Sequence, residues 1–254
     1  MRYLATADTD VGTTKNINQD SILIKHASTK KGEVLLAVIC DGMGGLSKGE
    51  LASATVIRAF SAWFDREMPY ELENLDLRVI GCKWEQLLLQ LNSDIMVYSQ
   101  KVGARLGTTF SGILFVDDIY LIVHVGDSRI YYLSSTSTEQ LTEDHTFVAR
   151  EIRRGNMTPE QAKTDSRRNV LLQCIGASQI VAPQVLHGRV KRGIYLVCSD
   201  GFRHEISEAE LVGTLNASLM TDKARMHENA RYLIDLVKSR GERDNISAVL
   251  IKAD

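Results

Sequence analysis

Four aspartates adjoin apolar, strand-sized runs, each at the point where a buried strand would enter or leave the core. They are Asp41 after 34–40, Asp127 after 119–126, Asp200 after 193–199, and Asp244 before 246–251. Short runs rich in Val, Leu and Ile are typical of strands buried on both faces. A single Asp-Gly pair after a strand favours an ordinary turn. Because the arrangement recurs four times, we expect the four carboxylates to converge on one acidic site.

The chemistry open to such a site follows from its ligand atoms. Gly42, Gly44 and Gly45 allow the backbone to turn sharply after Asp41 and to approach whatever that carboxylate binds. Carboxylates and backbone carbonyls are hard oxygen ligands, and without a neighbouring His or Cys cluster they select Mg²⁺ or Mn²⁺ over Zn²⁺ or Cu²⁺. Two such ions about 3.5–4 Å apart lower the pKa of a bridging water and hold an in-line displacement at phosphorus. The residues therefore predict metal-assisted phosphoester hydrolysis.

The elements that must position these residues follow from apolar runs and turn signals. Strands are expected at 2–7, 21–26, 34–40, 109–116, 119–125, 129–133, 184–190, 193–198 and 246–251. Helices are expected from 47, at 84–102, twice within 144–169, from 207, and at 222–240. Tight turns between successive strands favour antiparallel sheets over β-α-β units. Because the strands are apolar throughout, we predict an α+β fold, a four-layer sandwich of two antiparallel sheets with helices outside each.

Two of these helices carry local signals of their own. A capping box at Ser47 and Glu50 opens the first. In the second, apolar residues step by four and three alternately, which predicts that the whole stripe packs on a sheet. This stripe comprises Trp84, Leu88, Leu91, Ile95, Tyr98 and Val102.

Composition limits the possible partners and location. The chain has 254 residues, 44% of them apolar, and a net charge of −2, so it has no basic field for nucleic acid and no polybasic tail for a membrane surface. No apolar run is long enough to enter and cross a bilayer, and residues 1–8 lack a signal-peptide stretch. Four widely spaced cysteines are typical of free thiols in a reducing cytosol. We expect one domain over 1–254, a cytoplasmic monomer without membrane insertion.

Six short motifs occur in order along the chain. They are GTTKNINQD (12–20), DGMGG (41–45), LGTT (106–109), VGDSRIY (125–131), CSDG (198–201) and RDN (243–245). Each alone is weak, but six in order at compatible spacing are highly specific. Over nearly the whole chain they resemble the bacterial branch of the metal-dependent protein serine/threonine phosphatases, the protein phosphatase 2C-like family. The two-sheet sandwich of that family agrees with the layers expected above.

The resemblance implies a role for each matching residue. Asp41 would bridge two metal ions, Mn²⁺ or Mg²⁺, and the Gly42 carbonyl would bind one of them. Asp200 and Asp244 would hold the other ion, and Asp20 would act through metal-bound water. The catalytic residues would then include Asp41 and Asp200, joined by a residue that binds the phosphate.

A third ion and a flap are also implied. Asp127, together with Asp200, would match the third-metal site of bacterial members; the alternative is a turn residue that accepts hydrogen bonds from amides around Ser128 and Arg129. The segment at about 145–169 resembles the family's flap beside the active site, with a solvated surface excursion as the alternative. Four of its basic residues would bind substrate, namely Arg153, Arg154, Arg167 and Arg168.

Three positions depart from the family pattern. Lys15 replaces the usual phosphate-binding arginine, which keeps the charge but loses the bidentate fork. Gln19 replaces a glutamate, and Met43 stands where animal members have a histidine thought to protonate the leaving group. His145 or His204 could take that role, although a lone histidine is more often a packed or surface residue. We expect Lys15 to act as the catalytic phosphate anchor, with an exposed loop lysine as the alternative.

The predicted function is hydrolysis of phosphoserine and phosphothreonine on proteins by a metal-activated water, opposing a bacterial serine/threonine kinase. The expected partners are phosphorylated proteins, that kinase and its substrates. The alternatives are a weakly active relative that acts as a phosphoprotein-binding or regulatory module, and a two-metal hydrolase of small phosphoesters. Survival of all the ligand aspartates favours activity, because inactive relatives typically lose metal ligands.

Overall fold

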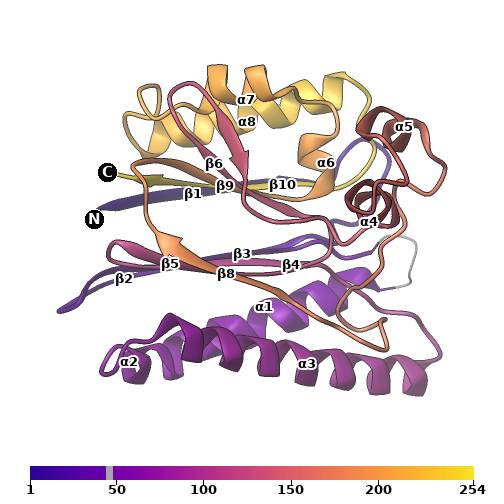
Figure 1. Cartoon of the computed structure of the whole chain (residues 1–254), viewed down its shortest axis with the longest axis horizontal. Helices are drawn as coiled ribbons and strands as arrows, with labels where there is room; N and C mark the ends of the chain where they lie inside the picture. Colours follow the sequence, from indigo (N-terminus) through magenta and orange to yellow (C-terminus); the bar gives the residue numbers. More distant parts are fainter. Residues whose placement is uncertain (44–47) are drawn as a thin grey trace.

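Two five-stranded sheets stack face to face in the computed structural model, which describes residues 1–43 and 48–254 (Figure 1). The first sheet has the strand order β1 (Tyr3–Asp10), β10 (Ile246–Ala253), β9 (Gly193–Cys198), β6 (Arg129–Leu133) and β7 (Thr138–Gln140). The second has the order β2 (Ser21–Thr29), β3 (Gly32–Cys40), β4 (Phe110–Val116), β5 (Ile119–Val125) and β8 (Gln184–Arg189). All neighbouring strands pair antiparallel, as the sequence predicted.

Helices cover the outer face of each sheet (Figure 1). The second sheet is covered by α1 (Gly49–Arg66), α2 (Met68–Glu71) and α3 (Leu77–Val102). The first sheet is covered by α6 (Asp200–Arg203), α7 (Glu208–Leu215) and α8 (Lys223–Ser239). Two short helices, α4 (Phe147–Arg153) and α5 (Pro159–Thr164), lie at one end of the sandwich as a small flap. The predicted four-layer architecture with a flap is therefore confirmed.

Strand β3 illustrates why its sequence is apolar without interruption. Leu35, Ala37 and Ile39 face the other sheet in the central core. Leu36 and Val38 alternate with them and face the helices α1 and α3. All five are fully buried. Because side chains of a strand point to opposite faces in turn, a strand with a sheet on one side and helices on the other must be apolar at every position.

The apolar stripe of α3 is buried only in part, which corrects the prediction for its C-terminal end. Trp84 is fully buried and packs edge-on against Phe60, with ring centroids 5.0 Å apart. Tyr98 and Val102 are 42% and 39% exposed. The 26 residues of α3 span roughly 39 Å, whereas the seven residues of β4 span roughly 23 Å. The helix therefore outlasts the strands on which it packs, and its last turns have no sheet beneath them.

Other local signals gave mixed outcomes. Helices α5 and α7 lie where helices were expected, and each begins with a capping box, at Thr158 and Ser207 respectively. The short elements α2, α6 and β7 were not predicted. The glycine turn at 44–45 and the capping residue Ser47 lie outside the described residues. Among residues 1–43 and 48–254, no helix combines the length and the apolar character that crossing a bilayer requires.

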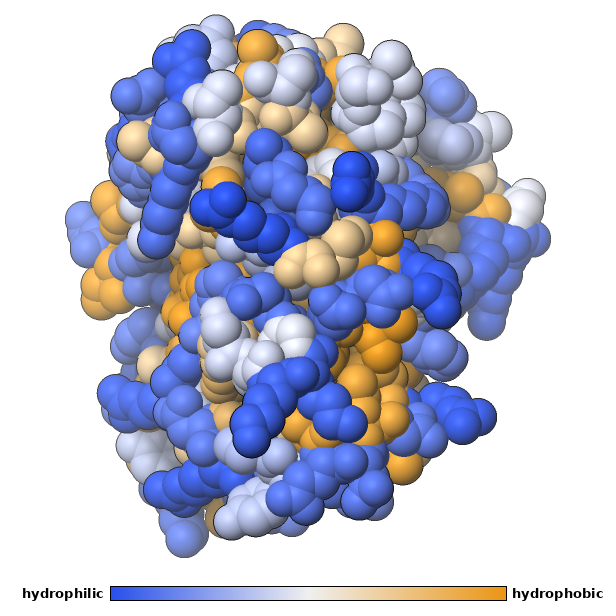
Figure 2. Space-filling view, turned by 90° about the vertical axis from the view of Figure 1, so that its left-hand side faces the viewer, coloured by the Kyte–Doolittle hydropathy of each residue, from blue (hydrophilic) through white to orange (hydrophobic). Residues whose placement is uncertain are grey.

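Both chain termini lie at the end of the sandwich opposite the flap (Figure 1). The Arg2 amide donates to the Asp254 carbonyl at 3.3 Å, and the Asp254 amide donates to the Arg2 carbonyl at 3.1 Å. Figure 2 shows this end: hydrophilic side chains cover most of it, and hydrophobic ones appear mainly at the level of the second sheet and the helices below it. The two ends of the chain are thus neighbours.

Asp10, at the end of β1, ties helix α8 to the loop that follows. Its Oδ2 accepts hydrogen bonds from Arg231 Nη2 at 2.7 Å and Lys238 Nζ at 2.9 Å, and its Oδ1 accepts one from the Gly12 amide at 2.9 Å. Burial raises the pKa of Asp10, but the hydrogen bonds from Lys238 and Arg231 outweigh it and lower the pKa to about 2. A carboxylate with a depressed pKa stabilises the fold while it is ionised.

We expect Asp10→Asn to lower the free energy of unfolding at pH 7 by about 1–2 kcal/mol. Because the pKa falls from an ordinary 3.8 to about 2 on folding, the stabilisation is complete above pH 3.8 and is lost as the pH falls toward 2. The variant should therefore lose stability less steeply over that range in urea titrations. The control is Asp235→Asn, which removes an exposed partner of Arg231 and should cost under about 0.5 kcal/mol. Equal losses in both variants would contradict the assignment.

Candidate metal and catalytic site

The strand-end aspartates converge at the end of the sandwich that carries the flap. Burial raises the pKa of Asp41 well above its usual range, and the neighbouring charges of Asp20, Asp200, Asp127 and Asp244 raise it further. Asp200 is the first residue of α6 and follows β9 after Ser199, and Asp244 is separated from β10 only by Asn245. The structure thus brings together the four aspartates that the sequence grouped, with Asp20 as a fifth.

Asp20 provides a test of whether a cation suits this place. Both of its carboxylate oxygens are buried, and neither has a hydrogen-bond partner among the described residues. Burial raises the pKa of Asp20 to about 7; nearby Ser247 and Ser199 hydroxyls offset part of the increase, and the charges of Asp200 and Asp244 add to it. A buried carboxylate without a partner is costly unless it is protonated or meets a positive charge. The all-oxygen donors fit Mg²⁺ or Mn²⁺.

Side chains alone do not complete a coordination shell. Within the described ranges, no three of the His, Cys, Asp and Glu side chains are drawn together tightly enough to hold an ion by themselves. Mg²⁺ commonly takes only one or two carboxylates and keeps several waters. Backbone carbonyls and water would therefore have to supply the remaining ligands.

The backbone around Asp41 is fixed by its neighbours. The Asp41 amide donates to the Thr109 hydroxyl at 2.9 Å, and the Asp41 carbonyl accepts from the Thr109 amide and the Thr108 hydroxyl, both at 2.9 Å. At Gly42, a Cβ atom would lie 2.4 Å from the Gln19 carbonyl oxygen and 2.6 Å from that of Gly49. Only glycine fits there, and the carboxylate of Asp41 is presented from a rigid strand end.

Asp127 follows a turn that also requires glycine. Gly126 has φ +113°, and a Cβ there would lie 2.6 Å from Thr109 Cγ2. Asp127 is 9% exposed. Burial raises its pKa to about 7; the charge of Asp200 adds to the increase and the guanidinium of Arg203 opposes it. Asp127 thus lies within electrostatic reach of the other carboxylates.

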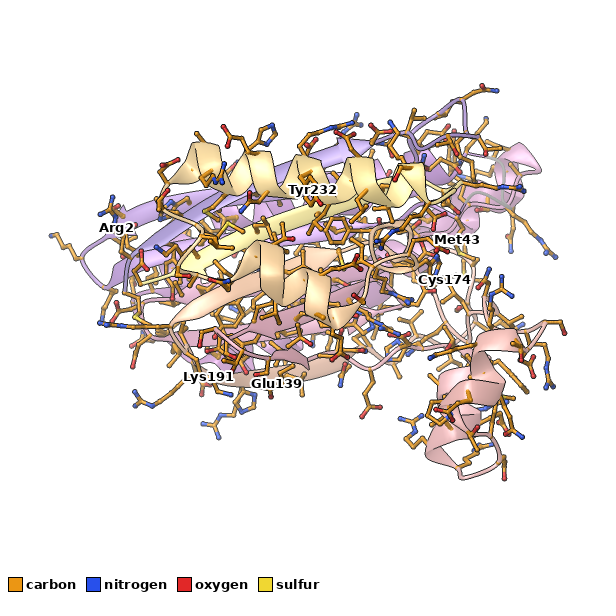
Figure 3. All side chains as sticks on the ribbon, turned by 90° about the horizontal axis from the view of Figure 1, so that it is seen from above. Arg2, Met43, Glu139, Cys174, Lys191 and Tyr232 are labelled. Atoms are coloured by element: carbon orange, nitrogen blue, oxygen red, sulfur yellow. The ribbon has the colours of Figure 1, made fainter. Side chains whose placement is uncertain are left out.

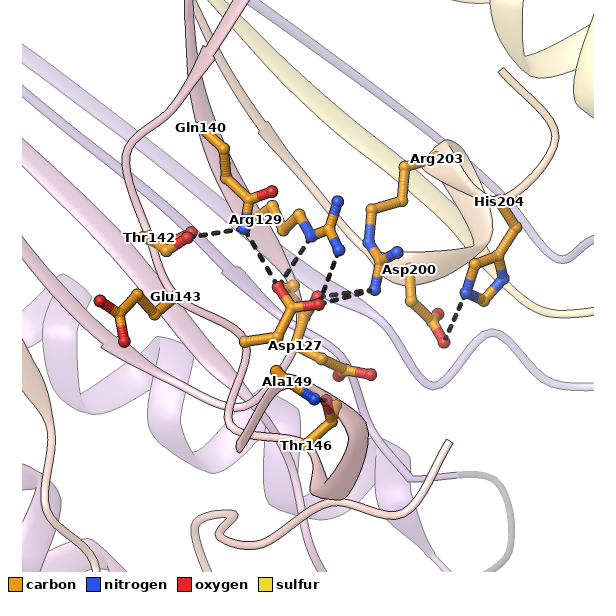
Figure 4. A network of polar contacts seen from close by, with 12 residues as sticks. Asp127, Arg129, Gln140, Thr142, Glu143, Thr146, Ala149, Asp200, Arg203 and His204 are labelled. Atoms are coloured by element: carbon orange, nitrogen blue, oxygen red, sulfur yellow. Dashed lines mark hydrogen bonds and ion pairs between the residues drawn. The ribbon is translucent and has the colours of Figure 1, made fainter. Parts of the chain in front are cut away.

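A partly buried ion-pair network supports this turn (Figure 4). Arg129 makes two hydrogen bonds of 2.7 Å to the carboxylate of Asp144. Arg203 Nη2 lies 3.6 Å from the same carboxylate and donates to the backbone carbonyl of Asp127 at 3.2 Å. Burial raises the pKa of Asp144, but the hydrogen bonds and charge of Arg129 outweigh it and lower the pKa. The roles of these residues are not predicted from the sequence, although Arg129 lies in one of the six motifs.

Asn245 holds the loop that carries Lys15 and Asp20, a role that is likewise not predicted from the sequence. Its Oδ1 accepts from the Gln19 amide at 2.9 Å, and its Nδ2 donates to the carbonyls of Val11 at 2.9 Å and Ile17 at 3.2 Å. Its side chain is buried. One amide therefore anchors a loop more than 220 positions away in sequence. The only available signal was the RDN motif itself.

Gln19 and Lys15, the two residues of this loop that depart from the family pattern, have partners in the structure. Gln19 Nε2 donates to Glu50 Oε2 at 3.1 Å, a contact that a glutamate could not make without repulsion. Lys15 Nζ lies 3.1 Å from Asp244 Oδ1, with its side chain 31% exposed. Lys15 thus reaches the acidic cluster while remaining accessible from solvent.

The two histidines differ in their surroundings. His204 Nδ1 lies 3.3 Å from Glu242 Oε2, and its Nε2 lies 3.9 Å from Asp200 Oδ2. Burial lowers the pKa of His204, but Glu242 and Asp200 outweigh it and raise the pKa. His145 Nδ1 contacts the Gly126 amide at 3.1 Å and Gln173 Nε2 at 2.8 Å, which ties the flap base to the Asp127 turn.

The four flap arginines are exposed, and three of them pair within or near the flap. Arg153 pairs with Glu143 at 2.7 Å, and Arg154 lies 3.7 Å from Glu151. Arg167 pairs with Asp165 at 2.8 Å and lies over the Phe147 ring. Arg168 is exposed at the surface. These residues belong to the flap and not to the carboxylate cluster.

We expect Asn245→Ala to loosen the loop at 11–19, because it removes three hydrogen bonds of a buried side chain. Amide hydrogen exchange of that loop should accelerate while β10 remains protected, and kcat/KM should fall about tenfold or more. The matched control is Asn245→Asp, which can still accept from the Gln19 amide and should retain part of the protection. Unchanged exchange at 11–19 in the Ala variant would show that another contact holds the loop.

Comparison with known proteins agrees with this geometry. Residues 13–238 match the family described as Protein phosphatase 2C. The serine/threonine phosphatase stp of Listeria monocytogenes serotype 4b is 29% identical over 251 residues, which cover 97% of this chain and 94% of that protein.

Solved structures show the same similarity. The serine/threonine phosphatase Stp1 from Staphylococcus aureus has a TM-score of 0.85 at 27% identity, covering 100% of this chain and 96% of that one. The catalytic domain of the serine threonine protein phosphatase PstP, crystallised with two manganese ions, has a TM-score of 0.76 at 29% identity, covering 98% and 97%. The chain therefore belongs to the protein phosphatase 2C family, the metal-dependent serine/threonine protein phosphatases that its motifs predicted.

Proposed function

We propose that this chain removes phosphate from phosphoserine and phosphothreonine of proteins at the cluster around Asp41, opposing a bacterial serine/threonine kinase. The observation that carries the proposal is the unpartnered, buried carboxylate of Asp20 among four further aspartates. The names of the relatives, which are serine/threonine phosphatases, support the substrate class. The partners would then be phosphorylated proteins, and the kinase that acts on the same substrates.

The residues present suit two divalent cations, Mn²⁺ or Mg²⁺. Asp41 would bridge both ions, the Gly42 carbonyl would bind one, and Asp200 and Asp244 would hold the other. Asp20 would serve them through an intervening water. When bound, such a pair supplies a nucleophile at neutral pH and neutralises charge on the phosphoryl oxygens. The protein's own contribution is to hold the carboxylates on rigid strand ends, with Asp41 fixed through its backbone.

Asp127 is proposed as the ligand of a third, weaker cation together with Asp200. The raised pKa of Asp127, caused by burial and by the charge of Asp200, supports a place for a cation beside both. We expect fewer protein oxygens to converge there than at Asp41, so water would supply more of the shell. If Asp127 were instead a purely structural turn residue, its replacement would lower stability and leave the Mn²⁺ dependence of the residual activity unchanged.

We expect Asp127→Ala to fold, to keep two tightly held Mn²⁺ ions in calorimetric titration, and to lose turnover about tenfold or more, least at high Mn²⁺. Asp41→Ala should instead lose tight Mn²⁺ binding altogether. The control is Asp118→Ala, an exposed hairpin aspartate, which should change neither. If Asp127→Ala is destabilised and its residual activity keeps the wild-type Mn²⁺ dependence, Asp127 is a turn residue and there is no third site.

Lys15 is proposed as the residue that binds the phosphoryl group. Its ammonium lies 3.1 Å from Asp244 Oδ1 of the acidic cluster, and its side chain is partly exposed. A phosphoryl oxygen placed above the cations would compete with Asp244 for the same donor. Lysine offers a point charge without the bidentate geometry of arginine.

We expect Lys15→Ala to raise KM for p-nitrophenyl phosphate about 3- to 30-fold. The Kd for Mn²⁺ should stay equal or fall, because the variant removes a positive charge beside Asp244. Lys15→Arg should preserve or improve KM, and Lys31→Ala, an exposed hairpin lysine, should change nothing. An unchanged KM in Lys15→Ala would assign Lys15 to the solvent.

We also propose roles for the flap and a cellular location for the protein. We infer that residues 1–254 form a single phosphatase domain and that the flap at about 145–169 selects substrates. Its arginines Arg153, Arg154, Arg167 and Arg168 would exchange their exposed ion pairs for acidic groups of the phosphoprotein; such exposed pairs are weak. We also propose a cytoplasmic monomer, a setting that suits the free, buried thiols of Cys40 and Cys198.

A further inference from the structure

A pocket of about 750 Å³ lies between the C-terminal part of α3 and the segment 171–180 that follows the flap. This volume is within the range of ligand-binding clefts. Figure 3 shows two of its lining residues, Met43 and Cys174, close together at the flap end of the molecule. Its apolar walls are formed mainly by Met43, Met96, Leu106, Leu171, Cys174 and Ile180. The functional site described above does not use this pocket.

Backbone contacts connect the pocket to Gly42, beside the acidic cluster. Met43 follows Gly42 directly, and its amide donates to the Gly107 carbonyl at 3.1 Å. Gly42 is bridged to Thr108, which in turn exchanges hydrogen bonds of 3.0 and 2.9 Å with Ile175. Thr108 and Ile175 adjoin the lining residues Leu106, Cys174 and Gly176 in sequence, so the backbone next to the pocket also positions Gly42. Met43, two residues from Asp41, is therefore the lining residue through which the pocket adjoins the acidic cluster.

The walls are exposed in a way that core packing does not explain. Ile180 is 81% exposed and Leu172 is 40% exposed, and both line the pocket beside the C-terminal end of α3. Grouped, exposed apolar side chains around a hollow are typical of a binding surface. Met43 and Met96 have flexible, polarisable side chains that adapt to apolar partners of different shape.

The charge of the lining residues further limits the kind of chain segment that the pocket can bind. Arg105 is the charged residue of the lining, and no acidic side chain is found among the described residues that line the pocket. Arg105 is exposed and makes no ion pair with any residue in the described ranges. A chain segment with an apolar residue beside an acidic one would satisfy both features.

We propose that this pocket binds an apolar side chain of the phosphoprotein substrate, near in sequence to the phosphorylated residue, while Arg105 contacts an acidic neighbour. The proposal rests on the proposed function, because it assigns the flanking sequence read by the same site. The continuity of the pocket with Gly42 favours the substrate over a second copy of the chain or a free small molecule as occupant.

The test uses phosphoserine peptides in which one Leu or one Ser is placed at each position around the phosphoserine. With the wild-type enzyme and Mn²⁺, Leu at one position should raise kcat/KM about 5- to 50-fold over Ser. Ala177→Trp places a large side chain on the exposed lining of the pocket and should reduce that ratio to within about twofold. The matched control is Ala224→Trp, at an exposed position of α8 in the opposite layer, which should keep the wild-type ratio.

Charge reversal tests the second half of the proposal and does not depend on the tryptophan variant. For peptides that carry Glu or Lys beside the Leu, the wild type should prefer Glu. Arg105→Glu should invert that preference. Both Arg105 and Ile180 have exposed side chains, so Arg105→Glu and Ile180→Ser decide the question if Ala177→Trp fails to fold in thermal melts.

The outcomes separate the two proposals. Mn²⁺-dependent hydrolysis of all the peptides with no Leu preference overturns the pocket and leaves the proposed function intact. A Leu preference that survives equally in Ala177→Trp, or an unaltered charge preference in Arg105→Glu, also overturns the pocket. Absence of Mn²⁺-dependent hydrolysis of any phosphopeptide by the wild type overturns the proposed function itself.

Discussion

The crowding of partly buried carboxylates at one end of the sandwich is the constraint on which the rest of this structure depends. Five aspartates meet at one end of the sandwich, and burial and proximity raise the pKa of Asp20, Asp41 and Asp127. Such a cluster can exist only if the backbone leaves the carboxylates no room to separate, and if positive charge is close. The strand ends and the glycine turns supply the rigidity. Lys15 and Arg203 supply part of the charge, and the cations that the oxygen donors suit would supply the rest.

The sequence predicted the fold well because its physical causes are local. A strand covered on both faces must be apolar throughout, as in β3, and a helix start such as Thr158 or Ser207 has its own capping signal. Besides the short elements α2, α6 and β7, the failure arose where an element outlasts its partner: the periodicity of α3 continues through Tyr98 and Val102, but the sheet beneath does not. Periodicity reports which face is apolar and not how much of that face is covered.

The carboxylates of the site could be predicted from the sequence, but the residues that support them could not. Aspartates at strand ends are visible in sequence, whereas the partners Arg129 with Asp144, and Asn245 with the loop at 11–19, are joined only by folding. The partner of the unusual Gln19 is also brought close only by folding. Beside Glu50, an amide donates where a carboxylate would repel, so a departure that looked like a loss of charge is matched by its surroundings. Positions of this kind require the three-dimensional contact before they can be interpreted.

The adjoining termini have a practical consequence for handling this enzyme. Arg2 and Asp254 exchange backbone hydrogen bonds at the end of the sandwich opposite the flap. A fused protein or a surface tether attached at either end would therefore hold the enzyme with its catalytic end facing outward. A short linker could also join the two ends without disturbing the pairing of β1 with β10, which makes the chain a suitable scaffold for circular permutation.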